Sequence, residues 1–159
     1  MTRRMLMTVV AVNITVAVLA PGPVQADNPR AIDFGPWNGV VACESRGDSQ
    51  ALGRHNDAGL FQFIPSTFRW VADVHGRTNL AGKDPRNMTA AQQLRHAIRL
   101  RDMPGGGIGH WACGYRYGDG TRPIVVHGDP HPPKPRRCFR WMRKHVSKRV
   151  AASVCGYDR

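Results

Sequence analysis

The sequence lacks the cysteine and histidine spacings that mark metal-binding and thiol-redox proteins. Its four cysteines include no CxxC pair, and its seven histidines form no HExxH motif and no paired spacing on one helix. We therefore expect no metal and no organic cofactor, and we interpret the histidines as surface or packing residues. A chain of 159 residues is also too short for a large multi-domain machine. It predicts one small domain with appendages.

Long apolar runs are equally scarce, and the one present lies near the N-terminus. It spans Met5–Ala20, follows Arg3 and Arg4, and leads to the small-residue pattern Val24-Gln25-Ala26. The run is shorter than the about 20 residues that a bilayer-spanning helix needs. The pattern predicts a cleaved secretory signal over residues 1–26 rather than an uncleaved anchor, and hence a secreted, extracytoplasmic protein.

The sequence also has few acidic residues. Asp and Glu number 11 against 23 Lys and Arg, which gives a formal net charge of +12. Such an excess predicts an anionic partner. For an exported protein we expect anionic wall polymers or a membrane surface, reached through the basic tail, and no nucleic acid. We expect a monomer.

The sequence predicts a helical domain over residues 33–118. A first helix is predicted over about 36–47, because a proline favours its start and a glycine its end. A second begins at the Pro-Ser-Thr of residues 65–67. The third has the clearest signal, because Thr89 and Gln92 form a capping-box pattern before an amphipathic stretch.

Between the first two helices, residues 50–63 carry turn-like and glycine-containing segments. They predict a short hairpin or an extended loop that crosses the front of the first helix. The fold class we expect is therefore mainly α, with a short β-hairpin and a basic C-terminal extension.

That extension has two parts. Residues 119–137 are rich in proline and basic residues, which predicts a non-helical linker or strap. Residues 138–159 have the periodicity of a basic amphipathic helix. An unbroken helix would separate Cys138 and Cys155 by about 25 Å, so they pair only if the helix breaks, near His145–Ser147. Otherwise each bonds to the core.

One acid has an environment that the sequence defines. Trp37, Val40, Val41 and Glu44 follow at helical spacing, so the carboxyl group shares the apolar face of the first helix. Burial and the negative end of the helix dipole both raise the pKa of such a group. A carboxylic acid that stays protonated near neutral pH is what cleavage of a glycosidic bond requires.

Two blocks around this residue resemble a known family. Cys43-Glu44-Ser45 ends a helix that Trp37 begins, and Gly59-Leu60-Phe61-Gln62 is followed by Pro65-Ser66-Thr67. Together they resemble the lysozyme-like lytic transglycosylases. The cysteine before the glutamate is similar to the resuscitation-promoting-factor branch, whereas the Phe-Ile-Pro-Ser-Thr run is similar to the soluble lytic transglycosylases.

The resemblance implies site residues and a lysozyme-like α+β fold. Glu44 would be the general acid and then the base, and Gln62 would hydrogen-bond the sugar. Ser45 either orients a neighbouring group or bonds local backbone, and Tyr115 and Tyr117 are candidates for a cleft tyrosine. In the branch with the cysteine before the glutamate, that cysteine bonds one near the domain's end, which corresponds to a disulfide between Cys43 and Cys113.

The substrate that the resemblance implies is peptidoglycan, cut at the β-1,4 bond between N-acetylmuramic acid and N-acetylglucosamine. A lytic transglycosylase manages with one acid, because the muramoyl C6 hydroxyl attacks internally. Hydrolysis usually needs a second carboxylate. Asp48 has the position of a turn residue, whereas Asp57 precedes the Gly-Leu segment and would serve a hydrolytic muramidase. A third hypothesis is a non-enzymatic basic protein that binds walls or membranes.

Overall fold

The computed structural model describes residues 29–120, 122–130 and 135–157. The predicted signal at 1–26 lies outside the described residues. The elements in chain order are β1 (Arg30–Ile32), η1 (Gly35–Trp37), α1 (Asn38–Glu44), α2 (Pro65–Val74), η2 (Pro85–Asn87), α3 (Ala90–Asp102), η3 (Ile108–His110), η4 (Gly114–Arg116), β2 (Ile124–Val126), α4 (Pro135–Met142) and α5 (Lys148–Cys155).

The three predicted helices of the domain are all present. The first opens as the 3-10 turn η1 with Pro36 inside it and continues as α1, which ends at Glu44, three residues earlier than expected. Helix α2 starts at Pro65, as the sequence predicts. Helix α3 has the full capping box, in which the Thr89 side chain accepts from the Gln92 amide and the Gln92 side chain accepts from the Thr89 amide.

The sheet joins two segments that are far apart in the sequence. β1 pairs with β2 in antiparallel register, with Arg30 opposite Val126 and Ile32 opposite Ile124. Residues 50–63 carry isolated bridges, Leu52 with Ala58 and Ala58 with Phe63, rather than paired strands. A mainly helical protein with a small antiparallel sheet matches the predicted fold class, but the strand pair forms elsewhere.

The described part of the segment 119–130 lies on the core of the domain. β2 lies within it and pairs with β1, and Val126 is buried. The prediction of a non-helical segment over 119–137 is wrong at its end, because α4 begins at Pro135. Proline is tolerated at the first turn of a helix, so the proline-rich composition concealed this start.

The basic tail consists of two helices with a break between them. α4 ends at Met142 and α5 starts after Ser147, whose hydroxyl caps the helix by accepting from the Val150 amide. The break brings the Cα atoms of Cys138 and Cys155 to 5.7 Å, and the two sulfurs are bonded. The alternative of a broken helix is therefore the one that occurs.

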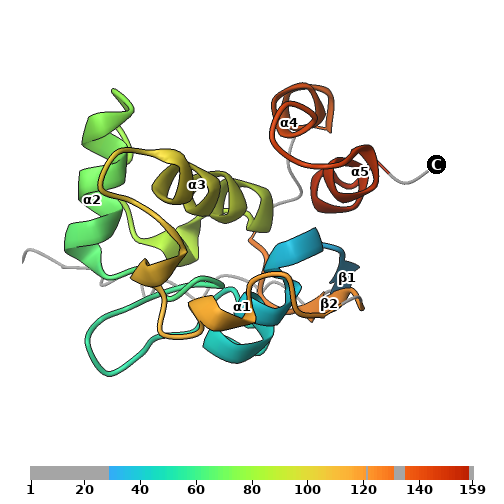
Figure 1. Ribbon diagram of the computed structural model, residues 1–159, viewed down its shortest axis with the longest axis horizontal. Coiled ribbons are helices and arrows are strands. Elements are labelled where there is room, and N and C mark those ends of the chain that lie inside the picture. The colour runs from blue at the N-terminus through green and yellow to red at the C-terminus, as the bar shows by residue number, and fades with distance from the viewer. Residues whose placement is uncertain (1–28, 121, 131–134, 158–159) are drawn as a thin grey trace, which may run out of the picture.

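Helix α5 docks on the start of the domain. Val150, Ala151, Val154 and Cys155 belong to the same buried core as the residues of β1 and α3, and Figure 1 shows α5 beside β1 and α3. Polar contacts secure this packing. The Asp33 amide donates to the Ser153 hydroxyl, the Arg149 guanidinium pairs with the Asp33 carboxylate at 2.9 Å, and Arg30 donates to the Val154 carbonyl.

A cluster of aromatic rings packs in the core beside α1. Trp37 contacts Phe61 and Trp111 edge to face, with ring centroids 5.5 and 5.1 Å apart. The Trp111 indole nitrogen donates to the Phe61 carbonyl. This cluster fixes the end of the α1 face, the 59–63 loop and the 108–116 turns against one another.

Candidate active site

Glu44 is the last residue of α1 and lines a cleft of about 200 Å3. The cleft lies between the end of α1, the 55–64 loop, the start of α2 and the η3 turn. Its lining residues are Glu44, His55, Asp57, Gln62, Phe63, Ile64, Thr67, Leu100, His110, Trp111 and Ala112. The acid at the helix end therefore faces a concave surface.

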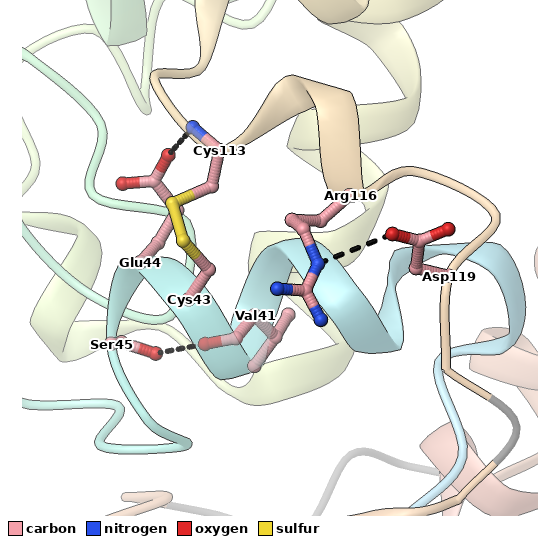
Figure 2. Close-up of a disulfide and its surroundings, with 7 residues drawn as sticks. All are labelled: Val41, Cys43, Glu44, Ser45, Cys113, Arg116 and Asp119. Carbon is pink, nitrogen blue, oxygen red and sulfur yellow. Dashed lines mark hydrogen bonds and ion pairs between the residues drawn. A yellow bond between two sulfur atoms is a disulfide. The ribbon is translucent and has the colours of Figure 1, made fainter.

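A disulfide beside the acid ties the end of α1 to the turn before η4. Cys43 is bonded to Cys113, with Cα atoms 6.0 Å apart, which is the pairing that the family resemblance implied. One oxygen of Glu44 accepts a hydrogen bond of 2.9 Å from the Cys113 amide. Figure 2 shows the disulfide and this hydrogen bond side by side, joining the end of α1 to the turn before η4.

The pKa of Glu44 is raised above its ordinary value. Burial is the largest cause, because a half-buried carboxylate loses hydration. The hydrogen bond from the Cys113 amide acts in the opposite direction, and the negative charge of Asp57 adds to the rise. The direction is the one predicted from the helical phase of Trp37, Val40 and Val41.

Asp57 lines the same cleft and is the second acid among the described residues there. Its carboxylate accepts from the His55 amide at 3.0 Å, and its carbonyl accepts from the Gly53 amide. A side chain on Gly53 would meet the Asp57 carboxylate, so this glycine leaves room for it. Asp57 therefore stabilises a tight turn and also carries charge into the cleft.

Gln62 lines the cleft in an uncommon backbone conformation. Its φ of 44° lies in the left-handed region, which residues other than glycine seldom adopt. Its side-chain nitrogen donates to the carbonyls of Gly59 and Ala51, at 2.8 and 3.3 Å. These bonds orient the amide across its own loop, and its carbonyl oxygen is the atom left to meet a ligand.

The loop that carries Gln62 is held from behind by a buried glutamine. Gln93 on α3 is fully buried, accepts from the Leu60 amide at 2.7 Å and donates to the Met88 carbonyl at 3.0 Å. Gly59 adopts a φ of +78° against this side chain, where a Cβ atom would meet the Gln93 oxygen. At the Gly-Leu motif the loop backbone therefore packs directly against the Gln93 side chain of α3.

Three predicted site residues lie outside the cleft. The Ser45 hydroxyl donates to the Val41 carbonyl and accepts from the Gly47 amide, so the local-backbone alternative describes it. Tyr115 is 75% exposed on η4. Tyr117 packs its ring on Trp37 and accepts a hydrogen bond from Arg101. The positions of these three residues in the sequence, close to the motifs, did not indicate the directions of their side chains.

Sequence reasoning missed several lining residues. His55 and His110 were interpreted as surface or packing residues, yet both line the cleft, as does Thr67. His55 lies two residues before Asp57 and His110 directly before Trp111, so adjacency to the motifs was the available signal. A further signal is that Glu44 is the only glutamate in the sequence.

A mainly helical α+β fold with a half-buried acid at a helix end, above a cleft, defines a lysozyme-like protein. Residues 32–122, more than half of the chain, match the family model of the transglycosylase SLT domain, and the chain belongs to this family. No curated protein and no solved structure matches the chain. The family confirms the resemblance to lysozyme-like lytic transglycosylases.

Proteins with this domain are transglycosylase-type enzymes that act on peptidoglycan in the extracytoplasmic cell wall. Within the described ranges, no helix has the length and apolar character needed to cross a membrane. The matched region ends at residue 122, before β2, although β2 and α5 cover β1.

Proposed function

We propose that this protein is a secreted lytic transglycosylase that cleaves the β-1,4 bond between N-acetylmuramic acid and N-acetylglucosamine, with Glu44 as its general acid and base. The observation that carries the proposal is the state of Glu44. It is half-buried over a cleft, its pKa is raised, and the Cys113 amide holds it in one position.

The reaction follows from one carboxyl group. Protonated Glu44 donates its proton to the glycosidic oxygen while the bond from that oxygen to the muramoyl C1 breaks. The resulting carboxylate then accepts the proton of the muramoyl C6 hydroxyl as its oxygen bonds to C1. The product is a 1,6-anhydro end, water is not consumed, and Glu44 regains its proton.

Two features support catalysis around this acid. The Cys113 amide stabilises the carboxylate form that arises midway, because a charge-assisted hydrogen bond strengthens as charge develops. Gln62 presents its amide from a constrained loop and is suited to hold a sugar substituent. We propose no catalytic role for Ser45, Tyr115 or Tyr117.

Asp57 favours one alternative, a hydrolytic muramidase. It lines the cleft and its charge acts on Glu44, as a second carboxylate would. Against this role, its carboxylate already accepts from the His55 amide within a tight turn. We therefore assign Asp57 to the electrostatics of the cleft and to its loop, rather than to activation of water.

The test is a product analysis with matched variants. Purified peptidoglycan is digested with the wild type, with Glu44→Gln and with Asp57→Asn, and the muropeptides are measured by mass. We expect anhydro ends from the wild type, loss of at least about a thousand-fold of the rate in Glu44→Gln, and anhydro ends from Asp57→Asn. Reducing ends that vanish in Asp57→Asn would establish hydrolysis, and full activity of Glu44→Gln would refute the role of Glu44.

A further inference from the structure

Another cavity, separate from the cleft at Glu44, is lined by three guanidinium groups. Arg77 follows α2, and Arg95 and Arg99 lie one helical turn apart on α3. They line a cavity of about 190 Å3 that shares none of its described lining residues with the cleft. No acid is among the described residues that line it.

These arginines repel one another in the structure as it stands. Burial lowers the pKa of Arg95, and the charge of Arg77 lowers it further. Burial, Arg77 and Arg95 act in the same way on the pKa of Arg99. The Arg95 Nε is buried and has no hydrogen-bond partner within the described structure. An anion in this cavity would offset the mutual repulsion of the three guanidinium groups.

An indole connects this cavity to a second basic surface. The Arg95 guanidinium lies 4.6 Å from the Trp141 ring centroid and that of Arg99 lies 5.7 Å from it. Trp141 also lines a shallow hollow of about 290 Å3 on α4, whose other lining residues are Arg136, Arg137, Arg140 and Lys144. The arginines of α3 and the basic residues of the tail therefore form one basic surface, with Trp141 between them.

One acid whose charge reaches this surface is already engaged. Asp102, whose charge reaches His145 beside Trp141, is held by the Arg101 guanidinium in two hydrogen bonds of 2.6 and 2.9 Å. His145 itself stacks on the Trp141 ring at 4.0 Å. The seven cations of the two hollows thus have no carboxylate among the described residues lining either.

We infer that this surface, called here the Trp141 basic track, binds a polymer of repeating phosphodiesters, with one phosphate in the Arg77/Arg95/Arg99 cavity and the next ones on α4. Guanidinium forks match the oxygens of a phosphate group, and two basic hollows that both involve Trp141 suit a chain of anions. The large apolar side chains that are exposed in the described structure lie outside α4 and α5, so a membrane surface is the poorer fit. The inference goes beyond the proposed cleavage reaction and does not depend on it.

Paired charge removals test the track. The double variant Arg77→Gln/Arg99→Gln removes two cations from the first cavity, and Arg143→Gln/Lys148→Gln removes two exposed cations of the tail that line neither hollow. Binding of the oxidised full-length protein is measured by calorimetry with poly(glycerol phosphate), inorganic phosphate and anionic phospholipid vesicles. Thermal unfolding confirms that both variants are folded.

We expect saturable binding of the polymer, at least ten-fold weaker in the first double variant and less than two-fold weaker in the second. A further double variant, Arg140→Gln/Lys144→Gln, should also weaken polymer binding but leave inorganic phosphate unaffected. Equal losses of polymer affinity in the first two double variants would show that binding depends only on the net charge of the protein and not on the track. Inorganic phosphate that binds as tightly as the polymer, or vesicles that bind when the polymer does not, would also overturn the inference.

Discussion

The carboxylate of Glu44 accepts a hydrogen bond from the amide of Cys113, and the sulfur of the same Cys113 is bonded to Cys43, the neighbour of Glu44. The disulfide and the hydrogen bond therefore act on one short path between α1 and the turn before η4. Both links hold the acid against this turn.

Removal of this disulfide should lower catalysis as well as stability. The variant Cys43→Ala/Cys113→Ala opens a link across 70 residues, which corresponds to about 4 kcal/mol of unfolding free energy. The folded fraction should in addition lose about ten-fold or more of its wall-cleaving rate, because the turn that carries the backbone amide of residue 113 is no longer tied to α1 and the amide no longer keeps Glu44 in one position. The measurements are urea unfolding and the initial rate per folded molecule.

The second disulfide provides the control. Cys138→Ala/Cys155→Ala opens a link across 17 residues and should cost about 3 kcal/mol of unfolding free energy. Its rate per folded molecule should stay within two-fold of the wild type. If both double variants lose activity only in proportion to unfolding, the link between the disulfide and the acid is wrong.

Asp57→Asn should shift the pH dependence of the reaction. Glu44 acts when protonated, so the rate falls as the pH rises through its pKa, which is raised by burial and by the charge of Asp57. Removal of that charge lowers the pKa, so the alkaline fall should move to lower pH. Asn keeps an acceptor for the His55 amide. Initial rates between pH 4 and pH 8 measure the shift, and an unchanged profile would mean that Asp57 has no electrostatic effect on Glu44.

Glu44 could be predicted because the helical periodicity and the family motif both pointed to it. The helical phase of Trp37, Val40 and Glu44 reports burial directly, because residues at that spacing share one helix face. The sequence did not indicate where the side chains of Ser45 and Tyr115 point, because Ser45 follows the end of α1 and Tyr115 lies in a three-residue turn, and no helical period applies at either place. His55 and His110 reach the cleft through loops whose path depends on tertiary contacts.

Gly59→Ala should destabilise the protein far more than Gly76→Ala. Both glycines have positive φ, +78° and +60°, so each alanine costs about 1–2 kcal/mol of backbone strain. Around Gly76 a Cβ atom meets nothing within 4 Å, whereas at Gly59 it meets the Gln93 oxygen that accepts from Leu60. We expect a further loss of about 1–3 kcal/mol at Gly59, measured by urea unfolding. Equal losses would show that the loop can move away from α3.

His96 should make the fold sensitive to mild acid. Burial lowers its pKa from 6.5 to about 4, so below pH 6.5 the unfolded chain binds a proton that the folded chain excludes. Unfolding is then favoured as the pH falls, by about 2 kcal/mol between pH 7 and pH 5. His96→Phe keeps a ring against Phe68 and should lose less stability over this interval. Parallel unfolding curves for the two proteins would contradict the assignment.

The tail illustrates what sequence patterns leave undetermined. Cysteine geometry predicted that Cys138 and Cys155 pair only across a broken helix, and the Ser147 cap supplies that break. Nothing local indicated that α5 joins the core, because apolar residues at helical spacing look the same whatever they pack against. The pairing of β1 with β2 is hidden for a similar reason, since three-residue strands carry little alternation.

The packing of α5 and β2 on β1 also sets the order in which the molecule is completed. A polypeptide leaves the ribosome from its N-terminus, so β1 is made early while both of its covers are made late. Copies cut short before β2 leave β1 without its partner strand, and copies cut short before α5 leave an apolar face open; proteases and aggregation exploit both features. The Cys138–Cys155 disulfide also needs an oxidising compartment to form, so a reduced copy lacks the bond that joins α4 to α5.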